Sequence, residues 1–393
     1  MKSIGLIAGF LFGSILIVFS QSGDTLYQNT AQRMLEEDAR LTIGGYAQVD
    51  FNQPVNKDIR QNGKFDVHRL VMLFGYKFDN KTSFITEIEY EHVKEVYVEQ
   101  AFLNYQINPF INVRAGLLLI PMGIINEYHE PTTYNGVERP NLDSKIVPTT
   151  WREIGAGIAG NVLDLSLKYQ VYMVNGFNGY DGSAKFSGAG GLRSGRQKGA
   201  ESFMSSPNFS AKIDYYGLSN LSIGLAGFVG KSQSVMFHGI DKDNSAAIAS
   251  ADSSVVGIAM FGLDARYNFN GLEIRGQINY VSLANTEQYN AFGGTDVGKT
   301  MFGYYAEIGY NLFRLTNISG DFIPFVRYEK YNTQHTVDAS IAKNEANNIT
   351  NVTVGIGWKP ASGAVFKFDY QVFSDATSAD PKKQMNLGIG IWF

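Results

Sequence analysis

The residues with the greatest potential for catalysis or metal binding are the histidines and the acids beside them. His129 lies in the segment NEYHE, residues 126–130, between Glu127 and Glu130. Two carboxylates and one imidazole are a weak metal signal here, because a second set of ligands at helical spacing is absent. We therefore predict a loop-packing role for His129. The other histidines lie near strand ends or in loops and indicate no Ser-His-Asp triad; they are His68, His92, His238 and His335.

A glycine-rich stretch, SGAGGLRSG at residues 187–195, is the other motif that could bind a ligand. A phosphate-binding loop needs a buried strand before it and Lys-Ser or Lys-Thr after it, and neither is present. We interpret the stretch as a flexible outer loop. The chain has no cysteine, which excludes thiolate metal sites, a Cys nucleophile, disulfides and a lipoprotein anchor. The sequence thus predicts neither an enzyme nor a bound metal or cofactor.

Charged residues often alternate in sign two positions apart. Lys212 is followed by Asp214, and Asp264 by Arg266. Such pairs lie on one face of a strand. They predict either a wall whose charges neutralise each other or a ring of basic residues that selects anions. The predicted basic residues of this face are Arg69, Arg114, Lys168, Lys212, Arg266, Arg275, Arg327, Lys359 and Lys367. Its predicted acids are Asp50, Glu87, Glu89, Asp164, Asp214, Asp264, Glu273, Glu307, Glu329 and Asp369.

The elements that carry these charges repeat with a period of two from residue 41 to residue 393. Ile111 and Val113, for example, alternate with Asn112 and Arg114. Stretches of about ten alternating residues fit strands that cross a bilayer at a tilt. The mean hydropathy of −0.12 is too low for a bundle of membrane helices. The net charge of −4 gives no basic excess, so we expect no nucleic-acid partner.

The predicted connections alternate between short and long. The short ones fall at residues 79–81, 108–109, 160–161, 216–220, 270–271, 314–320 and 360–363. The long ones fall at residues 52–63, 121–150, 176–205, 232–254, 284–299, 332–347 and 374–383. Residues 92–94 are the exception, short where a long loop is due. An even number of antiparallel strands, about sixteen, with short turns at one end and long loops at the other is typical of an outer-membrane β-barrel.

A barrel in lipid must close, because each unpaired backbone group there costs several kcal/mol. We therefore predict that residues 40–51 pair antiparallel with residues 384–393. The strand over residues 96–106 fits neither phase, since one phase exposes Gln100 and Asn104 to lipid and the other exposes Glu99. Either a bulge resets the phase or this face meets another protein, and of the two we favour a subunit interface.

The N-terminus divides into two further parts. Lys2 precedes an apolar run over residues 4–19, and Ser20 follows it. This pattern is typical of a signal peptide over residues 1–20, with a buried helix or an anchor as the alternative. Residues 21–39 are predicted to form a short periplasmic segment and residues 40–393 the barrel. The stretch AQRMLEEDAR, residues 31–40, is typical of a short helix. Residues 21–40 are too few for the plug of an energy-coupled transporter.

Two stretches resemble a known family. The stretches are residues 98–140, VEQAFLNYQINPFINVRAGLLLIPMGIINEYHEPTTYNGVERP, and residues 149–160, TTWREIGAGIAG. They resemble the phosphate-selective porin O/P family, most closely its members in the Bacteroidetes. The resemblance implies a sixteen-stranded, trimeric porin whose third external loop, here residues 121–150, folds inward and narrows the pore. In the best-known phosphate-binding members this loop is rich in Arg and Tyr. Here the loop also contains four acids, which offset the charge of its bases. They are Glu127, Glu130, Glu138 and Asp143.

Four basic residues are the candidates for an anion site at the constriction. Arg114 precedes the loop, Arg139 and Lys145 lie within it, and Arg152 follows it. The arginine fork matches phosphate or carboxylate oxygens two at a time. We predict a porin of the bacterial outer membrane, surrounded by lipid, that admits small hydrophilic solutes and prefers anions or phosphate. The alternatives are a non-conducting adhesion or complex-forming barrel and a barrel-embedded hydrolase.

Overall fold

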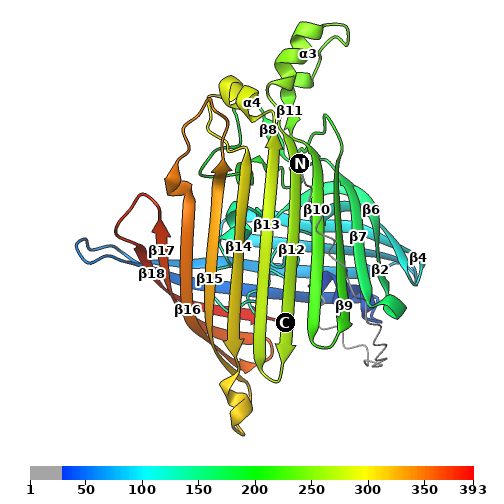
Figure 1. Cartoon of the computed structure of the whole chain (residues 1–393). Helices are drawn as coiled ribbons and strands as arrows, with labels where there is room; N and C mark the ends of the chain where they lie inside the picture. Colours follow the sequence, from blue (N-terminus) through cyan, green and yellow to red (C-terminus); the bar gives the residue numbers. More distant parts are fainter. Residues whose placement is uncertain (1–28) are drawn as a thin grey trace, which may run out of the picture.

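The computed structural model describes residues 29–393, so the predicted signal peptide lies outside the described residues. Within this range sixteen strands close into one antiparallel barrel, which confirms the predicted fold class (Figure 1). The strands are β1 (Leu41–Val55), β2 (Lys64–Lys77), β3 (Thr82–Glu91), β4 (Glu95–Asn108), β5 (Ile111–Leu119), β6 (Arg152–Val162), β7 (Leu167–Val174), β9 (Asn208–Leu218), β10 (Leu221–Lys231), β12 (Gly257–Phe269), β13 (Leu272–Ala284), β14 (Thr300–Tyr310), β15 (Asp321–Thr336), β16 (Asn348–Ala361), β17 (Ala364–Asp375) and β18 (Lys382–Trp392).

The remaining elements are not part of the closed sheet. The helices are α1 (Thr30–Glu36), α2 (Leu142–Lys145), α3 (Ser245–Asp252) and α4 (Thr286–Gly293). Among the described residues, no helix is both long enough and apolar enough to cross a bilayer. The short strands β8 (Asn178–Tyr180) and β11 (Gln233–Ser234) form a parallel pair in the long loops. The strands of the near and far walls cross in Figure 1, because strands in a barrel are tilted.

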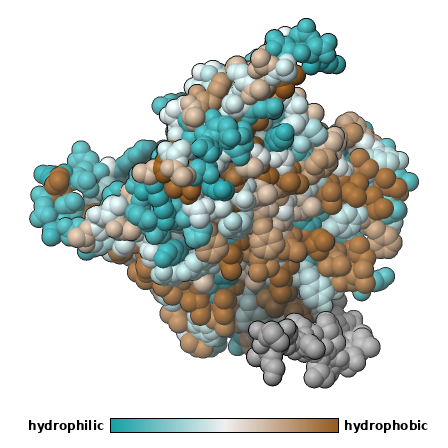
Figure 2. Space-filling model, turned by 45° about the horizontal axis from the view of Figure 1, so that its top comes forward, coloured by the Kyte–Doolittle hydropathy of each residue, from teal (hydrophilic) through white to brown (hydrophobic). Residues whose placement is uncertain are grey.

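Side chains alternate between two environments along each strand. In β12, Phe261 and Leu263 are 48% and 39% exposed, whereas Asp264 and Arg266 are 2% and 4% exposed. The apolar set therefore forms the outer face and the charged set lines the interior. Figure 2 shows apolar side chains over the outside of the barrel and polar side chains on the projecting loops. This is the arrangement that a barrel needs in order to meet hydrocarbon with its outer face.

The two terminal strands close the barrel in the predicted direction. Ala47 pairs with Ile391 and Val49 with Ile389. Gly45 and Phe393 exchange two backbone hydrogen bonds of 2.9 Å. A Cβ atom on Gly45 would lie 2.5 Å from a backbone oxygen of β2 and 2.8 Å from the ring of Phe393, so only glycine fits at this joint. Backbone pairing and packing thus both hold Phe393 in the closed sheet.

A β-bulge explains the irregular strand. Glu87 of β3 pairs with Gln100 and the next residue of β3 pairs with Val98, so Glu99 is the additional residue of β4. Glu99 and Gln100 are both buried, while Val98 and Leu103 are exposed on the outer face. The bulge, rather than the subunit interface that we favoured, therefore accounts for the phase of this strand.

The turn between β6 and β7 corrects one prediction. It lies three residues later than predicted, at a 3-10 helix over Leu163–Leu165 that ends at Ser166 with a positive φ of 51°. Asp164 consequently lies in an exposed turn and does not line the pore. Leu163 and Leu165 are 66% and 60% exposed, and their spacing imitates a strand in the sequence.

The register of closure is testable with cysteines at Val49 and Ile389, which are cross-strand partners. Facing residues of an antiparallel pair have Cα atoms about 4.5–5.5 Å apart, which permits a disulfide. We expect oxidation of membranes that contain Val49→Cys with Ile389→Cys to remove both free thiols. The control places the two cysteines at Val49 and Phe366. Phe366 of β17 pairs with Ile389 of β18, so it lies two strands from Val49, about 10 Å away. Loss of thiols in the control alone would contradict the register.

Candidate functional site

The segment of residues 120–151, which connects β5 to β6, is mostly buried and contacts strands in many parts of the barrel. Its contacts include Gly123 O with Lys212 Nζ of β9 at 2.8 Å, Ile124 N with Gln277 Oε1 of β13 at 2.8 Å, Tyr134 OH with Gln48 Oε1 of β1 at 2.9 Å, Val137 N with Asp369 Oδ2 of β17 at 2.6 Å and Asn141 Nδ2 with Glu329 Oε1 of β15 at 3.1 Å. These strands are distributed around the closed sheet. The segment is therefore anchored on several sides of the barrel.

Lys212 is a charged centre of this network. Its Nζ lies 3.0 Å from Glu127, 3.6 Å from Asp214 and 3.4 Å from Asp264, and its side chain has no solvent exposure. Burial alone would raise the pKa of Glu127, but the charges of Lys212 and Lys168 lower this pKa to about 2. Glu127 is thus held as a carboxylate, and it ties the segment to β9.

A second group of charges surrounds Glu307 of β14. Arg275 Nε lies 3.1 Å from one of its carboxylate oxygens and Arg327 Nη1 lies 3.4 Å from the other. The same arginines donate to backbone carbonyls of the segment, Arg275 to Thr133 and Arg327 to Glu138. This pairing agrees with the braced wall, in which inward charges neutralise each other.

Lys367 of β17 binds backbone carbonyls and makes no ion pair within residues 29–393. Its Nζ donates to the carbonyl oxygens of Tyr134 and Gly136, at 2.7 Å and 2.8 Å. The same ammonium lies 3.9 Å from the centroid of the Tyr134 ring. Lys367 therefore fixes the middle of the segment to the side of the barrel near the closing strands.

The structure separates the four candidate anion ligands. Arg114 Nε donates to Asn104 Oδ1 at 3.0 Å and its Nη1 to Tyr172 OH at 3.3 Å. Arg152 is buried with its Nη1 3.5 Å from Glu99 Oε1, so its charge is matched. The other two lie in the segment. Arg139 donates one long hydrogen bond to a backbone carbonyl, and Lys145 is the last residue of α2. Among residues 29–393, none of the four hydrogen-bonds to another.

A cavity of about 340 Å³ lies between α1, the segment and the wall. Arg114, Lys168 and Arg266 contribute to its lining together with Tyr128. Lys168 Nζ donates to the Tyr128 hydroxyl at 3.2 Å, and the guanidinium of Arg266 lies 4.3 Å from the centre of the same ring. Two of the basic residues predicted for the pore lining, Lys168 and Arg266, thus gather around Tyr128, and of the four candidates only Arg114 lines the same cavity.

The predicted N-terminal helix is present as α1. A capping box between Asn29 and Gln32 begins it. The backbone N of Thr30 lies 3.3 Å from Glu130 Oε1 of the segment, and the guanidinium of Arg33 lies 4.0 Å from the centre of the Trp392 ring. The helix is therefore attached to both the segment and the last strand.

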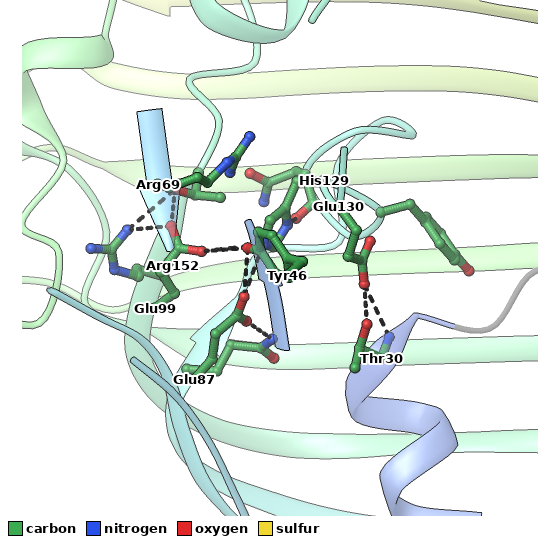
Figure 3. A network of polar contacts seen from close by, with 12 residues as sticks. Thr30, Tyr46, Arg69, Glu87, Glu99, His129, Glu130 and Arg152 are labelled. Atoms are coloured by element: carbon green, nitrogen blue, oxygen red, sulfur yellow. Dashed lines mark hydrogen bonds and ion pairs between the residues drawn. The ribbon is translucent and has the colours of Figure 1, made fainter. Parts of the chain in front are cut away.

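His129 has partners that the sequence did not indicate (Figure 3). Its Nε2 lies 3.2 Å from Glu87 Oε1 and 3.2 Å from Glu99 Oε2. The two neighbours in its own segment point elsewhere, Glu127 to Lys212 and Glu130 to Thr30. Burial alone would lower the pKa of His129, but the two carboxylates raise it well above its usual range. The only signal for this cluster in the sequence was the irregular phase around Glu99.

A closed barrel of sixteen strands with an apolar outer face and a charged interior defines the class of the molecule, an outer-membrane barrel with the porin fold. Solved structures with this fold include OmpF of Salmonella typhi in complex with daunomycin, 12% identical with a TM-score of 0.58, which covers 90% of this chain and 97% of that one. The anion-selective porin of Comamonas acidovorans is 10% identical with a TM-score of 0.55 over 90% of this chain and 99% of that one.

No model of a known protein family matches the chain. An uncharacterized protein of Aquifex aeolicus, strain VF5, is 30% identical over 362 residues, which cover 86% of this chain and 77% of that protein. The chain belongs to the same family as the Aquifex aeolicus protein.

Removing the charge of Lys212 tests the braced interior. Lys212→Met leaves three buried carboxylates without their shared cation, and breaking a buried ion pair costs about 3–5 kcal/mol. We expect a large fall in the temperature of thermal unfolding of the purified barrel. The control is Lys359→Met, because Lys359 makes no ion pair within residues 29–393. Equal effects of the two substitutions would mean that the pairs around Lys212 add no stability.

Proposed function

We propose that the chain is a porin through which small hydrophilic solutes diffuse passively across the outer membrane. The observation that carries this proposal is the closed barrel of sixteen strands, whose inner face bears the charged side chains and encloses the cavity beside Tyr128. Porins with this number of strands leave an aqueous channel. Diffusion through such a channel needs neither a catalyst nor an energy source.

In this proposal the segment of residues 120–151 folds into the lumen and forms the constriction. The support comes from its contacts with inward-facing side chains on β9, β13, β15 and β17. The helix α1 narrows the periplasmic end, since Gln32, Leu35 and Glu36 line the same cavity as Arg114. A solute that crosses the barrel then passes between α1, the segment and the wall.

The proposed preference is for anions. The lining of the cavity includes the bases Lys77, Lys81, Arg114, Lys168 and Arg266 and the acids Glu36 and Asp214. This excess of bases favours negatively charged solutes, whereas the charges around Lys212 and Glu307 cancel locally. Phosphate belongs to this class of solute, and the resemblance to phosphate-selective porins around residues 98–160 supports the same preference.

We also propose a homotrimer. The resemblance to the porin O/P family implies this assembly. The outer face of β4 supplies a surface that suits contact with a second copy or with lipid, because Val96, Val98, Leu103 and Tyr105 are exposed on it. The connection at residues 92–94, which leads into the same strand, is short.

Reversal potentials across a KCl gradient test the selectivity. Purified protein in a planar bilayer is expected to give the sign of an anion-selective channel. Arg114→Gln combined with Arg139→Gln removes two cations that make no ion pair within residues 29–393, so the reversal potential should shift toward zero. Lys57→Gln, at an exposed loop lysine, is the control and should leave it unchanged. A cation-selective wild type would contradict the basic constriction. A double variant whose reversal potential equals that of the wild type would contradict it as well.

A further inference from the structure

Three buried side chains from three separate parts of the chain converge next to Tyr46. Glu87 comes from β3, Glu99 from the bulge of β4 and His129 from the segment of residues 120–151. One nitrogen of His129 and one oxygen of each glutamate all lie within 4.8 Å of one another. Figure 3 shows the three side chains grouped around the Tyr46 hydroxyl. Imidazole nitrogen and carboxylate oxygen are both common ligands of zinc in proteins.

The distances fit a shared ion. A tetrahedral zinc ion about 2.0–2.1 Å from each ligand places neighbouring ligand atoms about 3.3 Å apart. His129 Nε2 is 3.2 Å from the nearer oxygen of each glutamate. The Tyr46 hydroxyl lies 2.8 Å from the same oxygen of Glu87 and 3.4 Å from that of Glu99. The hydroxyl oxygen of Tyr46, or a water molecule, can occupy the fourth position around the ion.

The other atoms of the three side chains are held by neighbours. Gln100 Nε2 donates to the second oxygen of Glu87 at 2.6 Å. Arg152 lies 3.5 Å from the second oxygen of Glu99, to which the Thr150 hydroxyl also donates. His129 Nδ1 faces the carbonyl oxygen of residue 126 at 3.3 Å. A metal-ligating histidine is oriented in this way, with its far nitrogen on a backbone carbonyl and its carboxylate partners hydrogen-bonded in turn.

Two states satisfy these contacts. In the first, a doubly protonated imidazolium of His129 donates to both glutamates. In the second, a neutral imidazole and the two carboxylates share a cation, which takes the place of the proton on Nε2. We propose that Glu87, Glu99 and His129 bind one divalent transition-metal ion and that zinc best matches this donor set. The ion joins the segment to β3 and β4 through His129 and so fixes the first half of the segment. The proposal does not depend on which solutes the pore admits.

Zinc binding to the full-length protein, folded in detergent and stripped with a chelator, tests the proposal. We expect titration calorimetry to give one zinc ion per chain. His129→Gln and Glu87→Gln should each weaken zinc binding by at least about 100-fold. At other metal sites, the loss of a residue that only hydrogen-bonds to a ligand already lowers the metal affinity by about 10–100-fold. Cobalt substituted for zinc should give the strong visible absorption of a four-coordinate site. The heat-modified mobility of the barrel in electrophoresis verifies that each variant is folded.

The matched control is His92→Gln. His92 lies 2.6 Å from Asp66, and its ring centre is 5.6 Å from that of His68, so this surface group is the main competitor for zinc. Binding should persist in His92→Gln. Retention of zinc by folded His129→Gln, loss of zinc in His92→Gln, or absence of binding to the wild type would each overturn the proposal.

A measurement on the wild type alone keeps the test decisive if the variants do not fold. X-ray absorption at the zinc edge counts the imidazoles bound to the ion. One imidazole with oxygen ligands supports the site at His129. Two imidazoles would assign the ion to His68 and His92 and would overturn it.

Discussion

The structure depends on one constraint, namely that a sheet in hydrocarbon must pair all of its backbone groups. The pairing of β1 with β18 meets this constraint and leaves no open edge. Closure also creates an interior, because the alternation along each strand then turns one set of side chains to lipid and the other inward. The charges inside the barrel, and everything that contacts them, follow from this division.

Charges inside the barrel need partners, since an isolated buried charge is costly. The wall supplies some of them, as with Lys212 beside Asp214 and Asp264. The segment of residues 120–151 supplies others through Glu127 and through its backbone carbonyls, two of which bind Lys367. The same interactions therefore stabilise the wall and position the segment. Arg114 instead donates hydrogen bonds to Asn104 and Tyr172 and makes no ion pair within residues 29–393.

The sequence predicted the fold well and the site only in part. Strand periodicity, the alternation of connections and the closing pair depend on local pattern and on backbone chemistry, and these predictions agree with the structure. The turn that contains Asp164 was misplaced because two exposed leucines continue the strand pattern through it. The bulge at Glu99 and the partners of His129 depend on which strands become neighbours. Spacing along the chain does not contain that information.

Single-channel recording in planar bilayers most directly tests the central claim, which is a water-filled barrel narrowed by an inward segment. The wild type is compared with a chain in which residues 132–140 are replaced by two glycines, which keeps Glu127, His129 and Glu130 in place. The account predicts discrete conductance steps for the folded wild type and larger steps for the shortened chain. Folded protein without any steps, or steps of equal size in the two proteins, would contradict it.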